Sequence, residues 1–231
     1  MSNVCIIPAR GGSKRIPRKN IKNFFGKPML AYPIQTALES ELFSKVIVST
    51  DDPEIAEAAQ KYGAEVPFIR PTDLADDFAG TAPVIKHALN FLAEAGETYT
   101  NVGFIYPCTP LISAKNLQAA YLAWQESEAE GCMSVCEFPS APQRSLIINS
   151  ANRIESLYPE NRGTRTQDLP STYYDAGQFY FAKVTAYLAG LAMHSNRTFP
   201  YILPRHLAQD IDTPADWQQA ELMFKLTLLE I

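Results

Sequence analysis

Short apolar runs recur along the chain, and each is bounded by charged or turn-forming residues. Several of these runs are rich in β-branched side chains and are too short for a helix. Such a run predicts a strand that is buried on both faces of a sheet. The predicted strands are Val4–Ile7, Lys45–Ser49, Glu65–Ile69, Val102–Tyr106 and Cys132–Cys136.

Longer segments between these strands have the features of helices. Asp52 and Ser113 are suited to cap two of them, Thr81 is a third candidate cap, and Pro53 suits a first helical position. Strands that alternate with helices predict an α/β fold with a mostly parallel sheet flanked by helices. The predicted helices are Met29–Ser40, Asp52–Tyr62, Thr81–Ala93, Ser113–Ser127 and Pro214–Leu229.

The alternation breaks at Glu137, and four prolines punctuate the segment that follows. No long helix is evident there, so residues 140–173 are predicted to be an insertion in the α/β domain. The alternation then resumes with a strand at Gln178–Ala182, a short helix at Val184–Gly190 and a strand at Tyr201–Leu203.

Length and composition narrow the class of protein. The 231 residues fit one large or two small domains, and 46% hydrophobic residues suffice for a proper core. No apolar run is long enough to span a membrane, and the apolar N-terminal stretch is too short for a signal peptide. The four cysteines match no zinc pattern, which favours reduced thiols and a cytoplasmic protein.

A glycine pair surrounded by cations follows the first predicted strand, from Ala9 to Asn20. Glycines permit positive φ and a close approach of backbone N–H groups to an anion, while Lys and Arg supply full charges. The segment matches neither a Walker P-loop nor a dinucleotide fingerprint. A solvated basic loop that touches nucleic acid is the alternative, but the net charge of −5 and the absence of a second basic stripe oppose it.

Further residues follow predicted strands at the same edge of the sheet, and a pair of aspartates near the end of the sequence is a candidate metal site. Asp51 and Pro107–Pro110 also follow predicted strands, and ligands of open α/β sheets bind outside the carboxyl ends of the strands. Asp210 and Asp212 would face one way in an extended segment with Ile211 in the core, as a Mg²⁺ site requires. Alternatively, these aspartates cap the last helix.

Four motifs together resemble those of the acylneuraminate (CMP-sugar) cytidylyltransferases, over nearly all 231 residues. The motifs are Ile7–Asn20, Ser49–Asp52, Tyr106–Pro110 and Tyr174–Tyr180, and the segment Gln209–Asp212 accompanies them. The resemblance implies a Rossmann-like sheet of the nucleotide-diphosphosugar transferase type in a single domain, 1–231. It also implies that segment 140–173 is an arm that helps to form a homodimer.

The resemblance also implies roles for individual residues. Arg10, Lys19 and Asp212 would be catalytic, and Asp210 and Asp212 would bind Mg²⁺. The implied nucleotide-binding residues are Ala9, Arg10, Gly11, Gly12, Ser13, Lys19, Asn20, Arg70 and Thr81. The implied sugar-binding residues are Tyr106, Arg165, Gln167, Tyr174, Asp175 and Gln178. A dimer-interface loop without a ligand is an equal alternative for the region of Arg165.

The implied reaction joins CTP and an acidic nine-carbon sugar to give a CMP-sugar and pyrophosphate. Tyr106 stands where sialate enzymes usually have glutamine, and Asp175–Gln178 departs from their asparagine-glycine-alanine motif. Both departures resemble the pseudaminic acid branch, with CMP-sialic or CMP-legionaminic acid synthesis as the alternative. A non-catalytic nucleotide sensor is the alternative of another class. Asp212 and a metal-bound water are both open as the general base.

Overall fold

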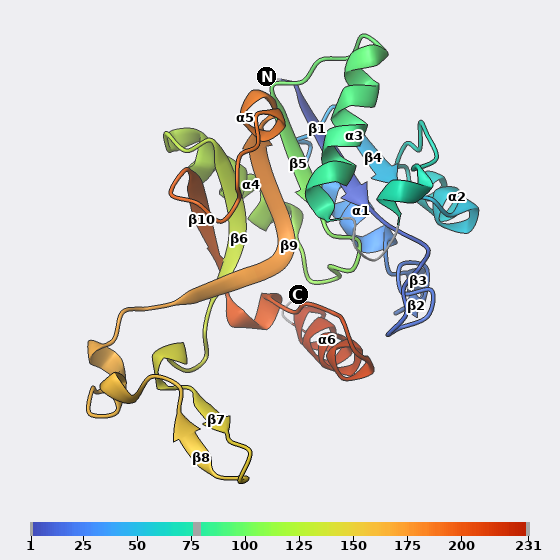
Figure 1. Ribbon diagram of the computed structural model, residues 1–231. Coiled ribbons are helices and arrows are strands. Elements are labelled where there is room, and N and C mark those ends of the chain that lie inside the picture. Colours follow the sequence, from blue (N-terminus) through green and yellow to red (C-terminus); the bar gives the residue numbers. More distant parts are fainter. Residues whose placement is uncertain (1, 76–79, 230–231) are drawn as a thin grey trace.

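The computed structural model describes residues 2–75 and 80–229 and has an α/β architecture (Figure 1). Its central sheet has six strands in the order β10-β6-β9-β5-β1-β4. β1 pairs in parallel with β4 and β5, and β10 pairs in parallel with β6, whereas β9 runs antiparallel to both of its neighbours. The predicted α/β fold with a mostly parallel sheet is therefore confirmed. The strands are β1 (Asn3–Pro8), β4 (Lys45–Ser49), β5 (Asn101–Ile105), β6 (Gly131–Glu137), β9 (Tyr173–Lys183) and β10 (Thr198–Leu203).

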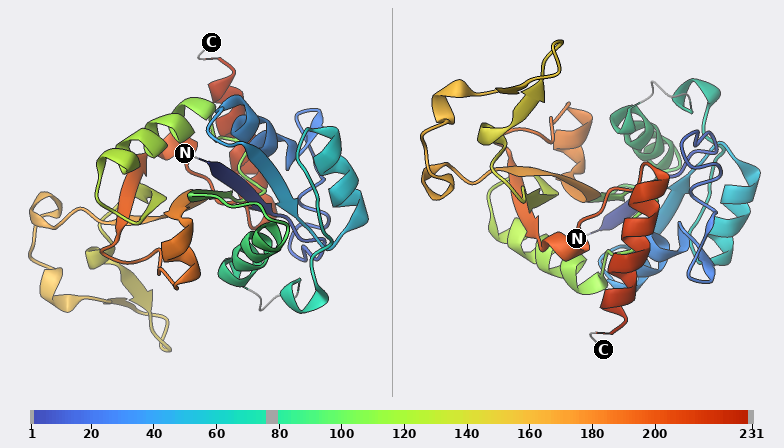
Figure 2. Two further views of the ribbon diagram at one scale, coloured as in Figure 1. Left: turned by 90° about the horizontal axis from the view of Figure 1, so that it is seen from above. Right: turned by 90° about the horizontal axis from the view of Figure 1, so that it is seen from below.

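Helices cover both faces of this sheet (Figure 2). Alternate residues of β1 explain the two layers: Cys5 and Ile7 join one core cluster, and Val4 and Ile6 join the other. α1, α2 and α4 pack on the first face, and α3 and α5 pack on the second. The helices are α1 (Ala31–Glu39), α2 (Pro53–Lys61), α3 (Thr81–Glu94), α4 (Ala114–Glu126), α5 (Val184–Leu188) and α6 (Pro214–Thr227).

The expected caps are formed at two helices and not at a third. Asp52 accepts from the amides of Glu54 and Ile55, and Ser113 accepts from the amide of Asn116. At α3 the cap is Gly80, and no side chain among the described residues caps the helix. The capping role of Thr81 is therefore wrong, because Thr81 lies one position inside the helix and its hydroxyl turns to Tyr106.

Three predicted strands differ in the structure, and one of them, β10, begins at Thr198 rather than at Tyr201. Glu65–Ile69 makes isolated bridges to Ile47 of β4 and to Thr50, since Pro67 lacks an N–H group and breaks the ladder. β9 begins at Tyr173 rather than at Gln178. Gly177 has φ +62° at an irregularity in the β6–β9 pairing, so the strand continues through the glycine that the sequence pattern placed before its start.

Segment 140–173 leaves the sheet and contains a small hairpin, β7 (Leu146–Ile148) and β8 (Ile154–Ser156) (Figure 1). Short 3₁₀ turns at Pro142–Arg144, Pro159–Asn161 and Thr166–Asp168 surround it. The remaining strands, β2 (Asn23–Phe24) and β3 (Lys27–Pro28), form a second hairpin near α1. No helix in the described part of the chain is long and apolar enough to cross a membrane.

Candidate active site

A pocket of about 220 Å³ opens at the carboxyl ends of β1 and β5. The strand order explains this place, because parallel neighbours deliver the loops after Pro8 and Ile105 to one edge of the sheet. Segments from the two ends of the chain meet in the pocket wall. The predicted site residues in this wall are Arg10, Ser13, Lys19, Asn20, Arg70, Thr81, Tyr106 and Asp212.

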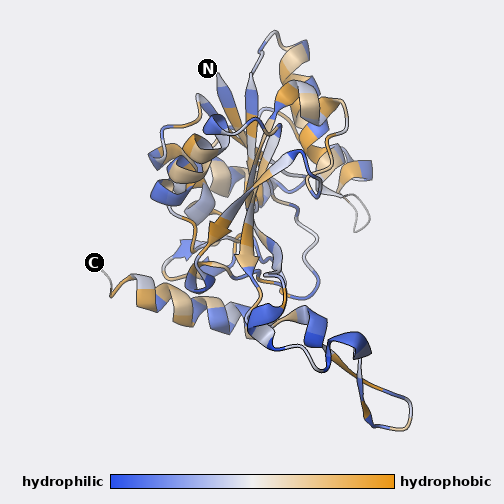
Figure 3. Cartoon of the chain, turned by 90° about the vertical axis from the view of Figure 1, so that its left-hand side faces the viewer, coloured by the Kyte–Doolittle hydropathy of each residue, from blue (hydrophilic) through white to orange (hydrophobic). Residues whose placement is uncertain are grey.

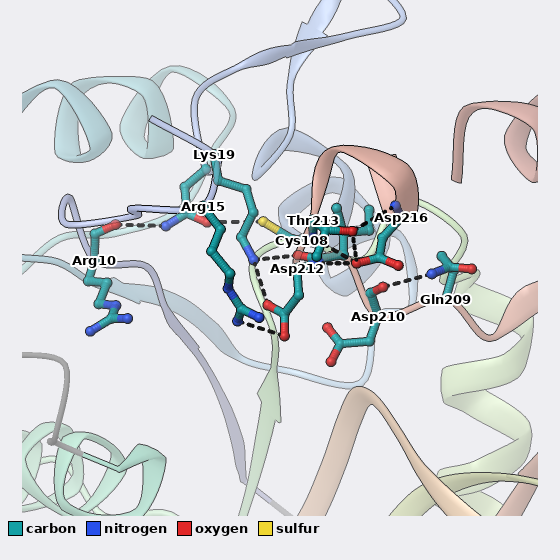
Figure 4. Close-up of polar contacts among 11 residues, drawn as sticks. Arg10, Arg15, Lys19, Cys108, Gln209, Asp210, Asp212, Thr213 and Asp216 are labelled. Carbon is teal, nitrogen blue, oxygen red and sulfur yellow. Dashed lines mark hydrogen bonds and ion pairs between the residues drawn. The ribbon is translucent and has the colours of Figure 1, made fainter. Parts of the chain in front are cut away.

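The electrostatics of the pocket favour an anionic ligand. Its described lining includes five cationic residues and one acidic residue, Asp212. The Asp212 carboxylate contacts Arg15 at 2.8 Å and Lys19 at 3.4 Å, and Lys19 also donates to the Ile211 carbonyl (Figure 4). Such an excess of positive charge in a concave site attracts polyphosphates. The cationic residues are Arg10, Lys14, Arg15, Lys19 and Arg70.

The glycine pair does not use the positive φ that glycine permits. Neither Gly11 nor Gly12 has a positive φ. Gly11 is instead required by a close approach: a Cβ there would lie 2.6 Å from the Asp52 carboxylate, and its amide donates to Asp51 at 3.0 Å. Ala9, which precedes the pair, is fully buried. These contacts hold the loop against the start of α2, and phosphate binding by its amides stays a prediction.

Arg18 anchors the same loop from its other end. Its guanidinium binds Asp52 and also contacts Glu54 at 2.9 Å. The hydrogen bonds from Arg18 hold the pKa of Asp52 below its usual value. Arg18 therefore connects the loop to α2 and is not part of the pocket lining.

The two aspartates flank a buried residue, because Ile211 is fully inaccessible. Asp212 lines the pocket, whereas Asp210 lies beside Gly177 of β9, outside the described lining. Partial burial and the nearby Asp212 charge raise the pKa of Asp210. Two carboxylates offer the hard oxygen donors that a divalent cation takes together with phosphates and water. No group of three or more His, Cys, Asp or Glu residues suited to hold a metal occurs among the described residues, so substrate oxygens would complete the site.

Arg70 and Thr81 form the far side of the pocket. Arg70 is only 4% exposed and donates to the side-chain and backbone oxygens of Ser49. Burial lowers its pKa to about 10, with Asp51 opposing that shift. The Thr81 hydroxyl lies 3.2 Å from the Tyr106 hydroxyl, so both oxygens stand at the pocket wall.

The residues predicted to bind sugar do not all reach the pocket. Tyr106 lines it, but Asp175 accepts from the buried Tyr180 hydroxyl at 2.7 Å and from the Gly177 amide. Gln178 is 1% exposed, and its amide donates inward to the Leu207 carbonyl. The Gln178 side chain is therefore directed into the protein and is not part of the pocket lining.

The remaining predicted sugar residues lie on or near the arm. The Tyr174 ring packs against the Phe138 ring at a tilt of 60°, with ring centroids 5.0 Å apart. Arg165 pairs with Asp168 at 2.7 Å, and Gln167 lies in the same 3₁₀ turn. None of the three is in the described pocket lining. Their part in sugar binding stays a prediction.

Cys108 is a site residue that sequence reasoning missed. Its thiol lies 3.1 Å from the Asn20 side-chain oxygen beneath the pocket. The available signal was its position in Tyr106–Pro110, at the end of a central strand, where side chains gather around ligands.

Comparisons with known proteins agree with this geometry. Residues 4–216 match the family model described as cytidylyltransferase. The chain is 39% identical to the pseudaminic acid cytidylyltransferase of Campylobacter jejuni, over 98% of this chain and 97% of that protein. It is 29% identical to the CMP-N,N'-diacetyllegionaminic acid synthase of Legionella pneumophila, over 98% and 97% of the two chains.

A solved structure shares the fold. It is a CMP:2-keto-3-deoxy-manno-octonic acid synthetase complexed with CTP, with a TM-score of 0.69, 17% identity and full coverage of both chains. Together with the family match, which spans nearly the whole sheet and the pocket, these findings show that the chain belongs to the cytidylyltransferase family.

Proposed function

We propose that this protein is a CTP-dependent pseudaminic acid cytidylyltransferase, which makes CMP-pseudaminic acid and pyrophosphate from CTP and the free sugar acid. The observation that carries this proposal is the pocket at the carboxyl edge of the sheet. It combines cations for a triphosphate with an aspartate that contacts two of them, Arg15 and Lys19. The 39% identical Campylobacter jejuni relative supports the choice of sugar.

In the proposed reaction, the anomeric hydroxyl oxygen of the sugar attacks the α-phosphorus of CTP. A new P–O bond forms, the bond to the β-phosphate bridging oxygen breaks, and the hydroxyl proton is released. Arg10 and Lys19 would bind the triphosphate and offset the charge that collects on the departing pyrophosphate. Positioning and charge neutralisation supply most of the catalysis in such transfers.

Cytidylyltransferases of this type generally use a divalent metal. We propose Mg²⁺, held by Asp210 and Asp212 together with substrate oxygens, because these carboxylates are hard ligands next to the cationic wall. The ion would supply charge neutralisation at the phosphates. Asp212 would then bind the ion instead of Arg15 and Lys19. Both cations would become available to contact phosphate oxygens.

An assay of pyrophosphate release tests the proposed function. The purified protein is offered each of the four nucleoside triphosphates with a panel of acidic sugars and Mg²⁺. We expect release only with CTP and a nonulosonic acid. Absence of release with every combination, from protein shown to be folded, would refute the activity.

We predict a preference for pseudaminic acid, a bis-acetamido 9-deoxy sugar, over N-acetylneuraminic acid. A site that hydrogen-bonds particular substituents rejects analogues that lack them by up to about 10⁴–10⁵. Tyr106, which is predicted to bind the sugar, places its hydroxyl at the pocket wall for such a bond. The measurement is kcat/KM for both sugars at saturating CTP. A higher kcat/KM for N-acetylneuraminic acid would overturn the choice of sugar and leave the cytidylyl transfer intact.

We propose further that the arm, residues 140–173, helps to form a homodimer. The strands of its hairpin carry hydrophobic residues (Figure 3). Ile148 and Ile154 are cross-strand partners, 74% and 71% exposed, and Leu146, two residues from Ile148, shares their face. A two-stranded hairpin alone is marginally stable in water. A second copy would cover this face, and it would allow Arg165 and Gln167 to contribute to the partner's sugar site.

Replacing Ile148 by aspartate is predicted to yield a monomer, because a charge would then be buried in the apolar contact. Multi-angle light scattering at micromolar concentration measures the mass. Glu155→Gln is the matched control, since Glu155 pairs with Ile147 on the opposite face of the hairpin. A fully active wild-type monomer would contradict the dimer.

We also place the reaction in the cytoplasm. All four cysteines are unpaired and buried, which suits a reducing compartment.

A further inference from the structure

Asn20 connects three parts of the molecule beneath the pocket. It is 3% exposed, and its side-chain nitrogen donates to the Arg10 carbonyl at 2.8 Å. Its side-chain oxygen accepts from the Cys108 thiol at 3.1 Å, and its backbone carbonyl accepts from the Leu30 amide at 2.8 Å. Figure 4 labels Arg10 and Cys108, the two residues that these side-chain hydrogen bonds connect.

The chemistry of these atoms fixes the direction of both side-chain bonds. A backbone carbonyl only accepts, so the amide nitrogen of Asn20 must face Arg10. The amide oxygen then faces Cys108, and only a protonated thiol can donate to it. Burial is the main cause that raises the pKa of Cys108 to about 12, so the thiol keeps its proton at neutral pH.

Three hydrogen bonds hold the backbone around Arg10. The preceding amide, of Ala9, donates to Ser49 at 3.0 Å, and the following amide, of Gly11, donates to Asp51 at 3.0 Å. The Arg10 carbonyl is the third fixed point, through Asn20. The side chain of Arg10 lines the pocket, so its place depends on these backbone contacts.

We propose that Cys108 is a positioning residue: its thiol sets the orientation of the Asn20 amide, and Asn20 thereby fixes the Arg10 backbone at the nucleotide pocket. This inference rests on the proposed function only for the identity of the ligand, CTP. The hydrogen bonds that join Cys108, Asn20 and Arg10 do not depend on the proposed function. Cys108 acts through Asn20 and touches no substrate.

The test compares Cys108→Ala, which removes the donor, with Cys108→Ser, which keeps one. Cys132→Ala is the matched control, because Cys132 is a fully buried thiol on β6 that belongs to another part of the core. Two readouts are used: amide hydrogen exchange of Ala9 and Gly11, and CTP binding by calorimetry in the presence of Mg²⁺.

Cys108→Ala is expected to accelerate exchange at Ala9 and Gly11 and to weaken CTP binding on the order of tenfold, since a buried acceptor loses its donor. Cys108→Ser is expected to restore both, and Cys132→Ala to leave both at wild-type values. In an Arg10→Ala background, Cys108→Ala should have no further effect on CTP binding, because it acts through Arg10.

Three results would overturn the proposal. They are unchanged exchange at both amides in Cys108→Ala, equal defects in the Ser and Ala variants, or a full additional loss of binding in the Arg10→Ala background. A wild-type protein that binds no CTP would refute the proposed function instead. The exchange measurement would still decide the role of Cys108.

Discussion

Replacing Asp212 by asparagine is expected to lower kcat by a factor at the upper end of about 10²–10³, the range for loss of one preorganised electrostatic group in an active site. Asp212 is the carboxylate of the pocket lining and a member of the proposed metal pair. The fold should persist, because the side chain is 40% exposed, and the Asp212 amide keeps its bond to Asp216. Steady-state pyrophosphate release and thermal unfolding measure the two effects.

The matched control is Glu126→Gln, which makes the same change from acid to amide at an exposed residue of α4, away from the pocket. This variant should retain wild-type turnover. If Asp212→Asn also did so, Asp212 would have no part in the chemistry. Undiminished pyrophosphate release in excess EDTA would contradict the proposed metal requirement, but it would not contradict the cytidylyl transfer reaction.

Removal of either cation proposed to bind phosphate is the second large effect that we expect. Arg10→Ala and Lys19→Ala should each reduce kcat/KM by about 10²–10³, since each charge would act on a developing anion in a preorganised site. Lys19 is the stronger case: its ammonium group already lies between the Ile211 carbonyl and Asp212, within reach of the proposed metal ligands.

The control for this pair is Lys115→Ala, at an exposed position of α4. It removes the same charge outside the described pocket lining, so any effect of overall charge appears in it as well. If both Arg10→Ala and Lys19→Ala kept kcat/KM near the wild-type value, the loop would have to be interpreted as a solvated basic surface.

Much of the fold follows from local pattern. The apolar runs of β1, β4, β5 and β6 end within a residue or two of the predicted positions, because each is long enough to mark a buried strand and is bounded by turn residues. Asp52 and Ser113 cap their helices as predicted, since a cap depends on residues only two or three positions away. The loop of cations and the Asp210–Asp212 pair were likewise visible as motifs.

The contacts that make these motifs a site were not visible, because they join residues distant in sequence. Only the tertiary structure brings Asp212 to Lys19 and Cys108 to Asn20. The same holds for Gly11, whose lack of a side chain serves the approach of Asp52 rather than a positive φ.

Sequence by itself therefore determined the class of fold, the edge of the sheet where the pocket opens and the charges that gather there. The tertiary structure decided which residues face the pocket. Gln178 lies in a motif rich in polar residues, yet the bulge at Gly177 and the pairing of β9 direct its amide to the Leu207 carbonyl. The direction of a side chain on a strand depends on register, and register is set by neighbouring strands far away in the chain.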